Sequence, residues 1–461
     1  MNEQSQPERK LSRRAFLFAS GGAAFAVALA ACAPPAAAPS APAASSGAAE
    51  PAAPAAAAPA AEAEEISFLV RTDIRNAYAA DAAATAWAEQ FPDRKLILDE
   101  PAAGTAVNTK VQAAQAAGDL IWDGYAVIAV PWDTAAWIKQ GLIQPLDEFI
   151  AASSIPGASD VVAGIIPTVL ESSKAEGKQY AIPGNVGSVA LGWYNEFLDE
   201  AGVDRPLLTW DDVRIAAEKV HAQHPEINAF DRPNTPLTDL VGMIWGATDA
   251  PYTDEGLIDW SGEASLASIE WMQSMVADGL MPAVNAGFGT WLQKGTAIMS
   301  SFDVHGTLAQ QTFGDGAADT GINMRRVASE PRAGAPFWLN GCVVLDKANN
   351  PQGMTDFFLW WFSPQNKANG KQIADVAAKP AYQYTYDEFI KDVPKHAWQL
   401  EGIDLVRNSV PFQANLTWGI ETGIVKTWLE KALDPANGLS AADAMGSALE
   451  EIDVEIKDML S

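Results

Sequence analysis

Apolar residues follow two alternating periods along residues 65–130. Short, mostly apolar runs at 65–70, 94–101 and 119–130 are typical of β-strands. The segments between them, 78–91 and 107–118, carry apolar residues at helical spacing. Strands that alternate with helices pair in parallel and form the sheet of an α/β layer. The pattern therefore predicts an α/β fold for this part of the chain.

Helical patterns dominate the rest of the chain. Residues 133–150 predict a helix, a turn and a short helix, and residues 263–280 predict an amphipathic helix. In 209–223, Thr209 is a predicted N-cap followed by acidic residues in the first turn. Residues 354–368 are apolar all round, which predicts a buried helix. The sequence shows no repeat with a period of 20 to 50 residues, so a solenoid is not expected.

The first 64 residues have the pattern of an address and a tether. Arg13 and Arg14 precede an uncharged apolar run of 17 residues, which is short for a membrane span and fits a signal peptide. The paired arginines resemble a twin-arginine export signal, and Leu-Ala-Ala-Cys at 29–32 resembles a lipobox that ends in a lipidated Cys32. We therefore expect a signal peptide at 1–31 and an Ala/Pro-rich tether at 32–64. The alternative is an ordinary N-terminal anchor helix.

Charge and cysteine content narrow the classes of function. Without residues 1–31, 430 of the 461 residues remain, enough for two or three domain-sized units. The formal net charge of −28 disfavours nucleic acid and anionic lipid as partners. If Cys32 is lipidated, Cys342 has no partner for a disulfide, and its apolar surroundings predict a buried, unreactive thiol. Trp is abundant, with 16 residues against 8 Tyr.

Residues 177–220 carry the most specific sequence motif. They hold a Gly-Lys-x-Tyr turn, a Pro-ended strand, a Tyr-Asn strand end, an Ala-Gly-Val turn with a later Pro, and a Thr-Trp-Asp helix start. In this order the pieces resemble the family 1 extracellular solute-binding proteins of ABC importers. Segments 137–150, 291–303, 339–368 and 438–456 resemble further parts of that family in the same order, so the resemblance extends from about residue 66 to the C-terminus.

The resemblance implies an α/β, two-lobed periplasmic-binding-protein fold with a hinge and a ligand cleft between the lobes. We expect lobe 1 to comprise 65–186 and 340–380, and lobe 2 to comprise 187–339 and 381–461, with crossing segments near 186–189, 338–341 and Pro380. It also implies a monomer without cofactor or metal that delivers a carbohydrate to a permease. The lipid would hold the protein at the outer face of the cell membrane.

Aromatic rings stack on sugar faces, and polar side chains bind sugar hydroxyls, so we looked for both in predicted loops. In the N-terminal third, the alternatives to ligand binding are a salt-bridged turn, plain core, or a helix cap in the case of Asp133. The candidates in this part are Arg71, Asp73, Asp123, Tyr125, Trp132 and Asp133.

The remaining candidates lie at the crossings and in later loops. Buried polar groups at the first crossing need a partner, whereas packing in the core is the alternative for the aromatic residues. The family often has Gly-x-Trp where this chain has Phe302 and Asp303, which puts a stacking role there in doubt. The candidates in this part are Asn185, Ser188, Trp245, Phe302, Asp303, Trp338, Asn340 and Trp418.

Motifs for catalysis are missing from the sequence. It contains no HExxH, EF-hand, Walker A or Rossmann glycine motif, and the spacing of Glu218, His221 and His224 is that of a solvated helix face. A binding protein for carbohydrate import is thus the leading hypothesis. The alternatives are a binding protein for another solute, such as a polyamine or glycerol phosphate, and a tethered glycoside-acting enzyme, since 58 acidic residues leave a carboxylate pair open.

Overall fold

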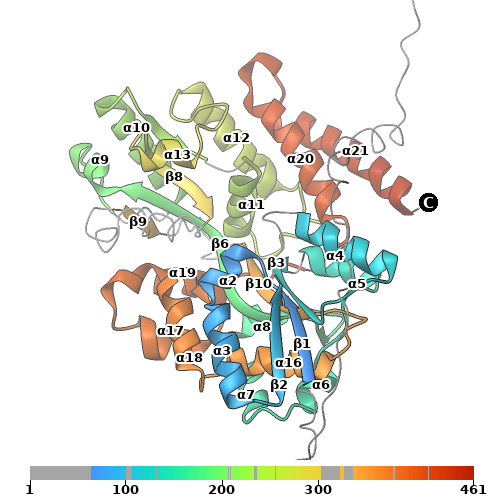
Figure 1. Ribbon diagram of the computed structural model, residues 1–461. Coiled ribbons are helices and arrows are strands. Elements are labelled where there is room, and N and C mark those ends of the chain that lie inside the picture. The colour runs from blue at the N-terminus through green and yellow to red at the C-terminus, as the bar shows by residue number, and fades with distance from the viewer. Residues whose placement is uncertain are drawn as a thin grey trace, which may run out of the picture. The chain divides into compact units, whose positions relative to one another are not determined.

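The computed structural model describes residues 64–99, 106–130, 132–205, 207, 209–232, 236–254, 256–302, 322–325, 336–376, 379–413 and 415–460. Figure 1 shows their elements. The strands are β1 (Glu64–Leu69), β2 (Arg94–Asp99), β3 (Gly124–Val130), β4 (Lys174–Ala175), β5 (Lys178–Gln179), β6 (Ile182–Tyr194), β7 (Asn228–Asp231), β8 (Thr296–Phe302), β9 (Ile322–Arg325), β10 (Phe337–Val344) and β11 (Lys379–Pro380).

The helices cover both parts of the sheet. They are α2 (Thr72–Ala77), α3 (Ala80–Gln90), α4 (Ala106–Ala117), α5 (Trp132–Lys139), α6 (Asp147–Ala151), α7 (Ala158–Ala163), α8 (Pro167–Ser172), α9 (Asn195–Glu200), α10 (Trp210–Gln223), α11 (Pro236–Ala247), α12 (Glu263–Ala277), α13 (Phe288–Leu292), α16 (Pro351–Trp361), α17 (Lys367–Val376), α18 (Gln383–Thr385), α19 (Ala397–Arg407), α20 (Trp418–Leu433) and α21 (Ala441–Leu460). Single turns are η1 (Tyr386–Ile390), η2 (Pro394–His396) and η3 (Pro435–Asn437).

One strand, β6, belongs to both parts of the main sheet. The strand order is β2-β1-β3-β10-β6-β8-β7, and β9 and β11 also pair with β6. β1 runs parallel to β2 and β3, which confirms the parallel pairing that the alternating sequence pattern predicts. β10 is antiparallel to β3 and to β6, and β8 is antiparallel to β6. The 13 residues of β6 therefore continue one sheet from β10 to β8 (Figure 1).

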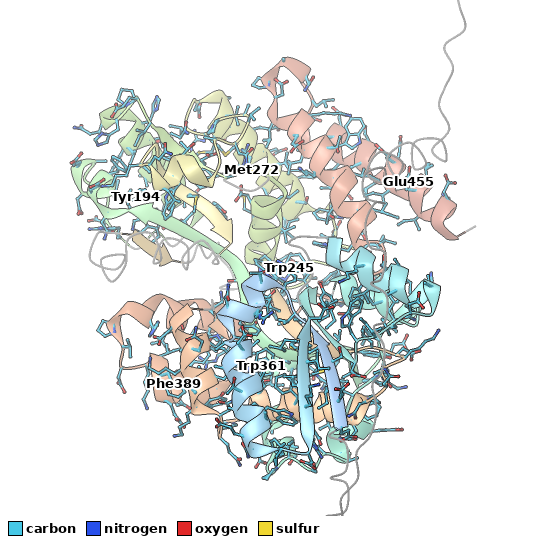
Figure 2. All side chains as sticks on the ribbon, viewed as in Figure 1. Tyr194, Trp245, Met272, Trp361, Phe389 and Glu455 are labelled. Carbon is cyan, nitrogen blue, oxygen red and sulfur yellow. The ribbon has the colours of Figure 1, made fainter. Side chains whose placement is uncertain are left out.

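Buried side chains form two separate hydrophobic cores. The first core draws on 66–186 and 337–406, and the second draws on 191–298 and 412–452. Trp361 belongs to the first core and Met272 to the second (Figure 2). The buried residues of 381–406 lie in the first core, whereas the sequence-based division assigns that segment to the second lobe. The described chain passes from the first core to the second again between α19 and α20, about 30 residues beyond Pro380.

Two local predictions about helices are confirmed. The Thr209 side chain accepts the Asp212 backbone N–H at 3.1 Å, and the Asp212 side chain accepts the Thr209 N–H at 2.9 Å, which is a complete capping box for α10. α16 is buried on every side, and its Phe358 and Trp361 rings pack edge-on against Phe68 of β1. α16 therefore anchors the first core.

Candidate functional site

The strands of both cores end at the same stretch of β6. Val130, the last residue of β3, pairs with Leu339 of β10, which pairs with Val186 of β6. Phe302, the last residue of β8, pairs with Val189 of β6. β1 runs parallel to β3, and β7 runs parallel to β8, so their carboxyl ends point to the same stretch. Ligands of α/β sheets bind outside the carboxyl ends of the strands, which makes residues 186–189 the centre of the candidate site.

Several predicted residues lie at these carboxyl ends. Arg71 follows β1 as the N-cap of α2, and Asp73 lies in the first turn of that helix, where the sequence predicted a loop. Trp132 and Asp133 are the first two residues of α5, so Asp133 is not its N-cap. β1 lies between β2 and β3, so α2 and α5 flank the point where the strand order reverses.

In the sequence, Phe302 and Asp303, two further predicted residues, fall at the carboxyl end of β8. Phe302 is its last residue and pairs with the crossing stretch of β6. Asp303 lies outside the described residues, as does Cys32. The structure describes the backbone, but not the side chains, of Asp73, Trp132, Asp133 and Phe302. Their place at the strand ends thus follows from topology alone.

Asn185 joins the crossing strands to α2. Its Oδ1 accepts a hydrogen bond from the Tyr78 hydroxyl and another from Asn340 Nδ2 at 2.9 Å. Tyr78 closes α2 at the end opposite Arg71. The buried Oδ1 of Asn340 finds no donor among the described residues. Because an unpaired buried acceptor costs free energy, this oxygen is available to a ligand or a water molecule.

Trp338 lies on the backbone of β6 and is half-buried. A Cβ atom built on Gly187 would come within 2.3 Å of its Cε2 atom. Only glycine therefore allows the indole to approach the crossing strand so closely. The indole therefore packs closely on the β6 backbone while part of the residue stays exposed, as a stacking platform requires.

Lys379 reaches the crossing stretch from β11. Its side chain is fully buried, and its Nζ donates to the Ser188 hydroxyl at 3.0 Å. Burial lowers the pKa of the Lys379 ammonium to about 7. A Cβ on Gly402 of α19 would come within 2.7 Å of Lys379 Cδ, so this glycine makes room for the lysine. Ser188 thus has a protein partner on its hydroxyl.

The segment just before Trp418 and α20 is held by hydrogen bonds. Glu421, which is 0% exposed, accepts Trp260 Nε1 at 3.0 Å and Asn415 Nδ2 at 2.7 Å, and it also accepts the Thr417 hydroxyl. The Trp418 ring is partly buried and packs edge-on against Phe412, with 5.4 Å between the ring centroids. The hydrogen bonds of Glu421 therefore fix the helix turn that carries Trp418.

Three predicted residues have clear roles in the fold. Asp123 lies before β3, at the amino end of the strand, and its two oxygens accept the backbone N–H groups of Ser67 and Asn350 at 2.7 Å each. Tyr125 is buried and stacked on Trp137. Trp245 of α11 is buried, and its indole N–H donates to the Val410 carbonyl at 2.9 Å. We leave these three residues out of the proposed site.

A buried charged cluster ends β7, and the sequence analysis missed it. Asp231, Arg232 and Asp239 are each 1% exposed. Arg232 donates to the carbonyls of Pro282 and Ala283, at 3.2 and 3.0 Å, and lies 3.9 Å from Asp239. Burial raises the pKa of Asp239 to about 8, although Arg232 opposes that shift. The signal in the sequence was an Asp-Arg pair at the end of a strand, close to the kind of position used to select Arg71.

Cys342 is the one described cysteine, and it is 0% exposed. This confirms the prediction of a buried side chain, and burial also raises the pKa of the thiol. Within the described ranges, no group of three His, Cys, Asp or Glu side chains is arranged to hold a metal ion. His224 instead lies 3.0 Å from Glu200.

Two cores that share one strand, with the strand ends of both cores directed at it, define a two-lobed binding protein of the periplasmic type. The chain matches the family of bacterial extracellular solute-binding proteins over residues 72–368, which is more than half of its length. The protein belongs to this family. The resemblance seen in the sequence and the predicted fold class are thereby confirmed.

Solved structures share the fold at low sequence identity. A sugar-binding protein of Xanthomonas citri has a TM-score of 0.72 at 15% sequence identity. The superposition covers 86% of this chain and 98% of the Xanthomonas citri chain. An ABC substrate-binding protein of Listeria monocytogenes in complex with cycloalternan has a TM-score of 0.69 at 15% identity, covering 86% of this chain and all of its own. A cyclic α-maltosyl-1,6-maltose binding protein of Arthrobacter globiformis has a TM-score of 0.69 at 16% identity, with the same coverage.

Curated relatives align with a smaller part of this chain than the solved structures do. A candidate binding protein of Brucella abortus is 22% identical over 258 residues, which is 54% of this chain and 57% of the relative. A Brucella suis protein matches equally. The chain thus spans little more than half the length of these relatives. In the part of the chain that the structure describes, no helix has the length and apolar character needed to cross a bilayer.

Proposed function

We propose that this protein is the extracytoplasmic solute-binding lipoprotein of an ABC importer and that it binds a sugar or oligosaccharide for delivery to the permease. The observation that carries the proposal is the meeting of the strand ends of both cores at 186–189 of β6, where the half-buried Trp338 lies on Gly187. A ligand placed there touches both cores, so that its binding favours the closed arrangement of the two lobes.

Carbohydrate is the favoured solute class. Structural neighbours bind cycloalternan, maltose, α-D-tagatose and D-mannitol. In this chain, the half-buried Trp338 and the side-chain amides of Asn185 and Asn340 all belong to the crossing strands, a combination that suits a hydroxylated ring. The proposed contacts are Arg71, Asp73, Trp132, Asp133, Asn185, Ser188, Phe302, Asp303, Trp338, Asn340 and Trp418.

Cys32 and the Ala/Pro-rich segment after it support an anchored receptor. A lipid on Cys32 would hold the protein near its permease, and a Pro-rich tether would let the body reorient. We include export by the twin-arginine signal and action as a monomer in the proposal.

A ligand screen tests the solute class. Thermal unfolding is followed with linear and cyclic α-glucans, monosaccharides and sugar alcohols, and in parallel with polyamines and glycerol phosphate. The cognate ligand raises Tm by mass action, and calorimetry then gives its affinity. A rise with a polyamine or glycerol phosphate, and with no sugar, would replace the sugar by that solute. Release of reducing sugar from a bound oligosaccharide would instead identify an enzyme.

A further inference from the structure

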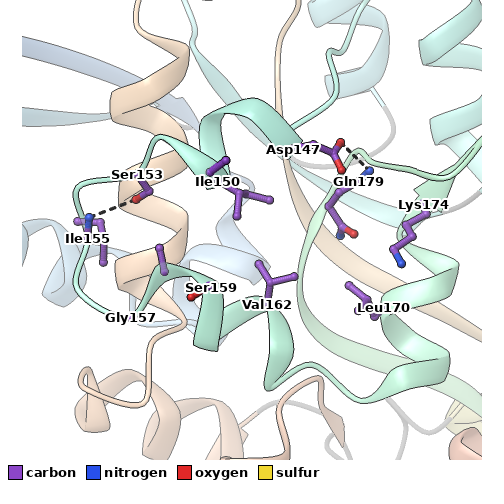
Figure 3. Close-up of a pocket in the computed structure, with 12 residues that line it drawn as sticks. Asp147, Ile150, Ser153, Ile155, Gly157, Ser159, Val162, Leu170, Lys174 and Gln179 are labelled. Carbon is purple, nitrogen blue, oxygen red and sulfur yellow. Dashed lines mark hydrogen bonds between the residues drawn. The ribbon is translucent and has the colours of Figure 1, made fainter.

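A pocket lies on the first core, among α6, α7, α8 and the β4–β5 hairpin (Figure 3). Its volume is about 460 Å³, within the usual range for small-molecule sites. None of the residues that line it is among those proposed above for sugar binding. Ile150, Val162 and Leu170 form an aliphatic wall, and no aromatic ring is among the described residues that line it. The wall therefore suits an aliphatic chain better than a sugar.

Gln179 supplies a fixed acceptor to this pocket. The side chain is 3% exposed, and its Nε2 donates to Ser173 Oγ at 2.6 Å and to the Ala181 carbonyl. The amide cannot be reversed, because that would set its oxygen against the Ala181 carbonyl oxygen. Its Oε1 has no hydrogen-bond donor among the described residues. A buried acceptor without a donor costs free energy, which a donor that reaches it would recover.

Asp147 adds a negative charge beside this acceptor. One carboxylate oxygen, Oδ2, accepts the Gln179 backbone N–H at 3.1 Å. Lys174 also lines the pocket, but its Nζ lies 2.6 Å from Glu171 Oε1, so its charge is compensated. Figure 3 shows Asp147 and Gln179 on one side of the pocket and Val162 and Leu170 below them. The pocket thus combines acceptors and a carboxylate with an aliphatic wall.

We propose that this pocket binds an alkylguanidinium or alkylammonium group, with its N–H donors on Asp147 and Gln179 and its aliphatic stem against Ile150, Val162 and Leu170. Hydrogen bonds to charged groups are stronger than neutral ones, and long basic side chains combine a charged head with an apolar stem in the same way. The group belongs to a free small molecule or to an arginine or lysine of a partner protein.

Methyl NMR of the full chain tests the proposal. The Ile, Leu and Val methyl groups are labelled, and n-butylguanidinium is titrated against its neutral isostere n-butylurea. We expect saturable shifts at Ile150, Val162 and Leu170 with n-butylguanidinium and at least tenfold weaker binding of n-butylurea. Asp147→Asn should weaken n-butylguanidinium binding about fivefold, as expected for one exposed charge pair. The matched control is Glu148→Gln, because Glu148 is the neighbouring exposed acid of α6 and does not line the pocket.

A second variant makes the test independent of the Asp147 side chain. Glu171→Gln uncovers the charge of Lys174 and should weaken n-butylguanidinium binding while sugar binding at the crossing stays unchanged. An arginine-containing tripeptide that gives the same methyl shifts supports presentation on a partner protein, and shifts with the free compound alone support a small molecule. Equal binding of n-butylguanidinium and n-butylurea, or unchanged binding in both variants, would overturn the proposal and leave the sugar site untouched.

Discussion

At the residue scale, Trp338 and Gly187 form one unit. The indole can lie this close to β6 only because Gly187 has no side chain. The same pair shows how a strand can present an aromatic ring without a loop. Replacing either residue changes the ring's position or removes it.

Trp338→Ala should weaken binding of the cognate solute by roughly 1–3 kcal/mol, the span for losing a large buried apolar side chain. This corresponds to about one to two decades in Kd. Calorimetry on the folded variant measures the change, and Trp428→Ala in the partly buried face of α20 serves as a control for the loss of an indole. Unchanged affinity of the Trp338 variant would remove this residue from the site.

Lys379→Met should change the pH dependence of stability. The pKa of this lysine falls from 10.5 to about 7 on folding, so between these values the unfolded chain holds a proton that the folded protein has lost. Raising the pH through this window therefore stabilises the wild type, by up to about 1.4 kcal/mol per pH unit. The variant lacks this gain, so its advantage over the wild type should be largest near pH 6 and shrink toward pH 10.

Urea unfolding at pH 6, 8 and 10 measures this effect. Lys371→Met is the matched control, because that side chain is 65% exposed and pairs with Asp375 on the same helix. A stability difference between wild type and Lys379→Met that does not vary with pH would show that Lys379 keeps the same charge in both states.

At the element scale, α20 begins in a network of hydrogen bonds centred on Glu421. The carboxylate has three side-chain donors and no exposure, so its removal leaves those donors unsatisfied. Both carboxylate oxygens accept hydrogen bonds from donors, and in Glu421→Gln the amide replaces one of these acceptors by an NH2 group that can only donate. Glu421→Gln should therefore destabilise the fold by about 1–3 kcal/mol. It should also weaken ligand binding if Trp418 contacts the solute. Urea unfolding and calorimetry measure both, and Glu430→Gln, exposed on the same helix, is the control that should change neither.

Helices could be predicted from the sequence where residues close together in the chain determine the structure. The capping box at Thr209 and the all-apolar helix α16 were predicted because spacing and burial leave one solution. α2 was missed because "TDIRNA" is a single short turn whose apolar contact, Ile74, is with distant parts of the first core. The start of α20 and the segment before it are held by hydrogen bonds from Trp260 to Glu421 and from the Gln413 backbone N–H to the Tyr252 hydroxyl. Trp260 and Tyr252 lie about 160 residues earlier in the chain. Sequence spacing carries no trace of such pairs.

At the scale of the whole molecule, the two-lobed fold was predictable from the order of motifs, but the path between the cores was not. Segment 381–406 joins the first core through Tyr382, Tyr386 and Ile390, whose apolar pattern would fit either core. The Asp231–Arg232–Asp239 cluster was missed for a related reason, because its carbonyl partners at 282 and 283 come from another part of the chain. The proposed site residues remain predictions, supported by their place at the strand ends.

The proposed export and anchoring concern the whole molecule as well. Arg13→Lys with Arg14→Lys should block translocation, because the paired arginines are the defining residues of the proposed export signal. Cys32→Ala should release the exported protein from membranes, since the proposed lipid on Cys32 would supply the anchor. Cell fractionation and intact mass measure both effects. A mature protein that starts anywhere other than a diacylated Cys32 would contradict the lipoprotein assignment.

The position of β10 along the chain sets the earliest time at which the first core can form. β10 pairs with both β3 and β6, yet it lies at Phe337–Val344, after the whole of segment 191–298, the first of the two segments that build the second core. At a synthesis rate of 5–20 residues per second, the ribosome needs on the order of ten seconds to travel from β6 to β10. During that interval the facing edges of β3 and β6 have no partner strand between them. The nascent chain is therefore open to mispairing until residue 344 has emerged, and a chaperone that covers these two strand edges would have its greatest effect in that interval.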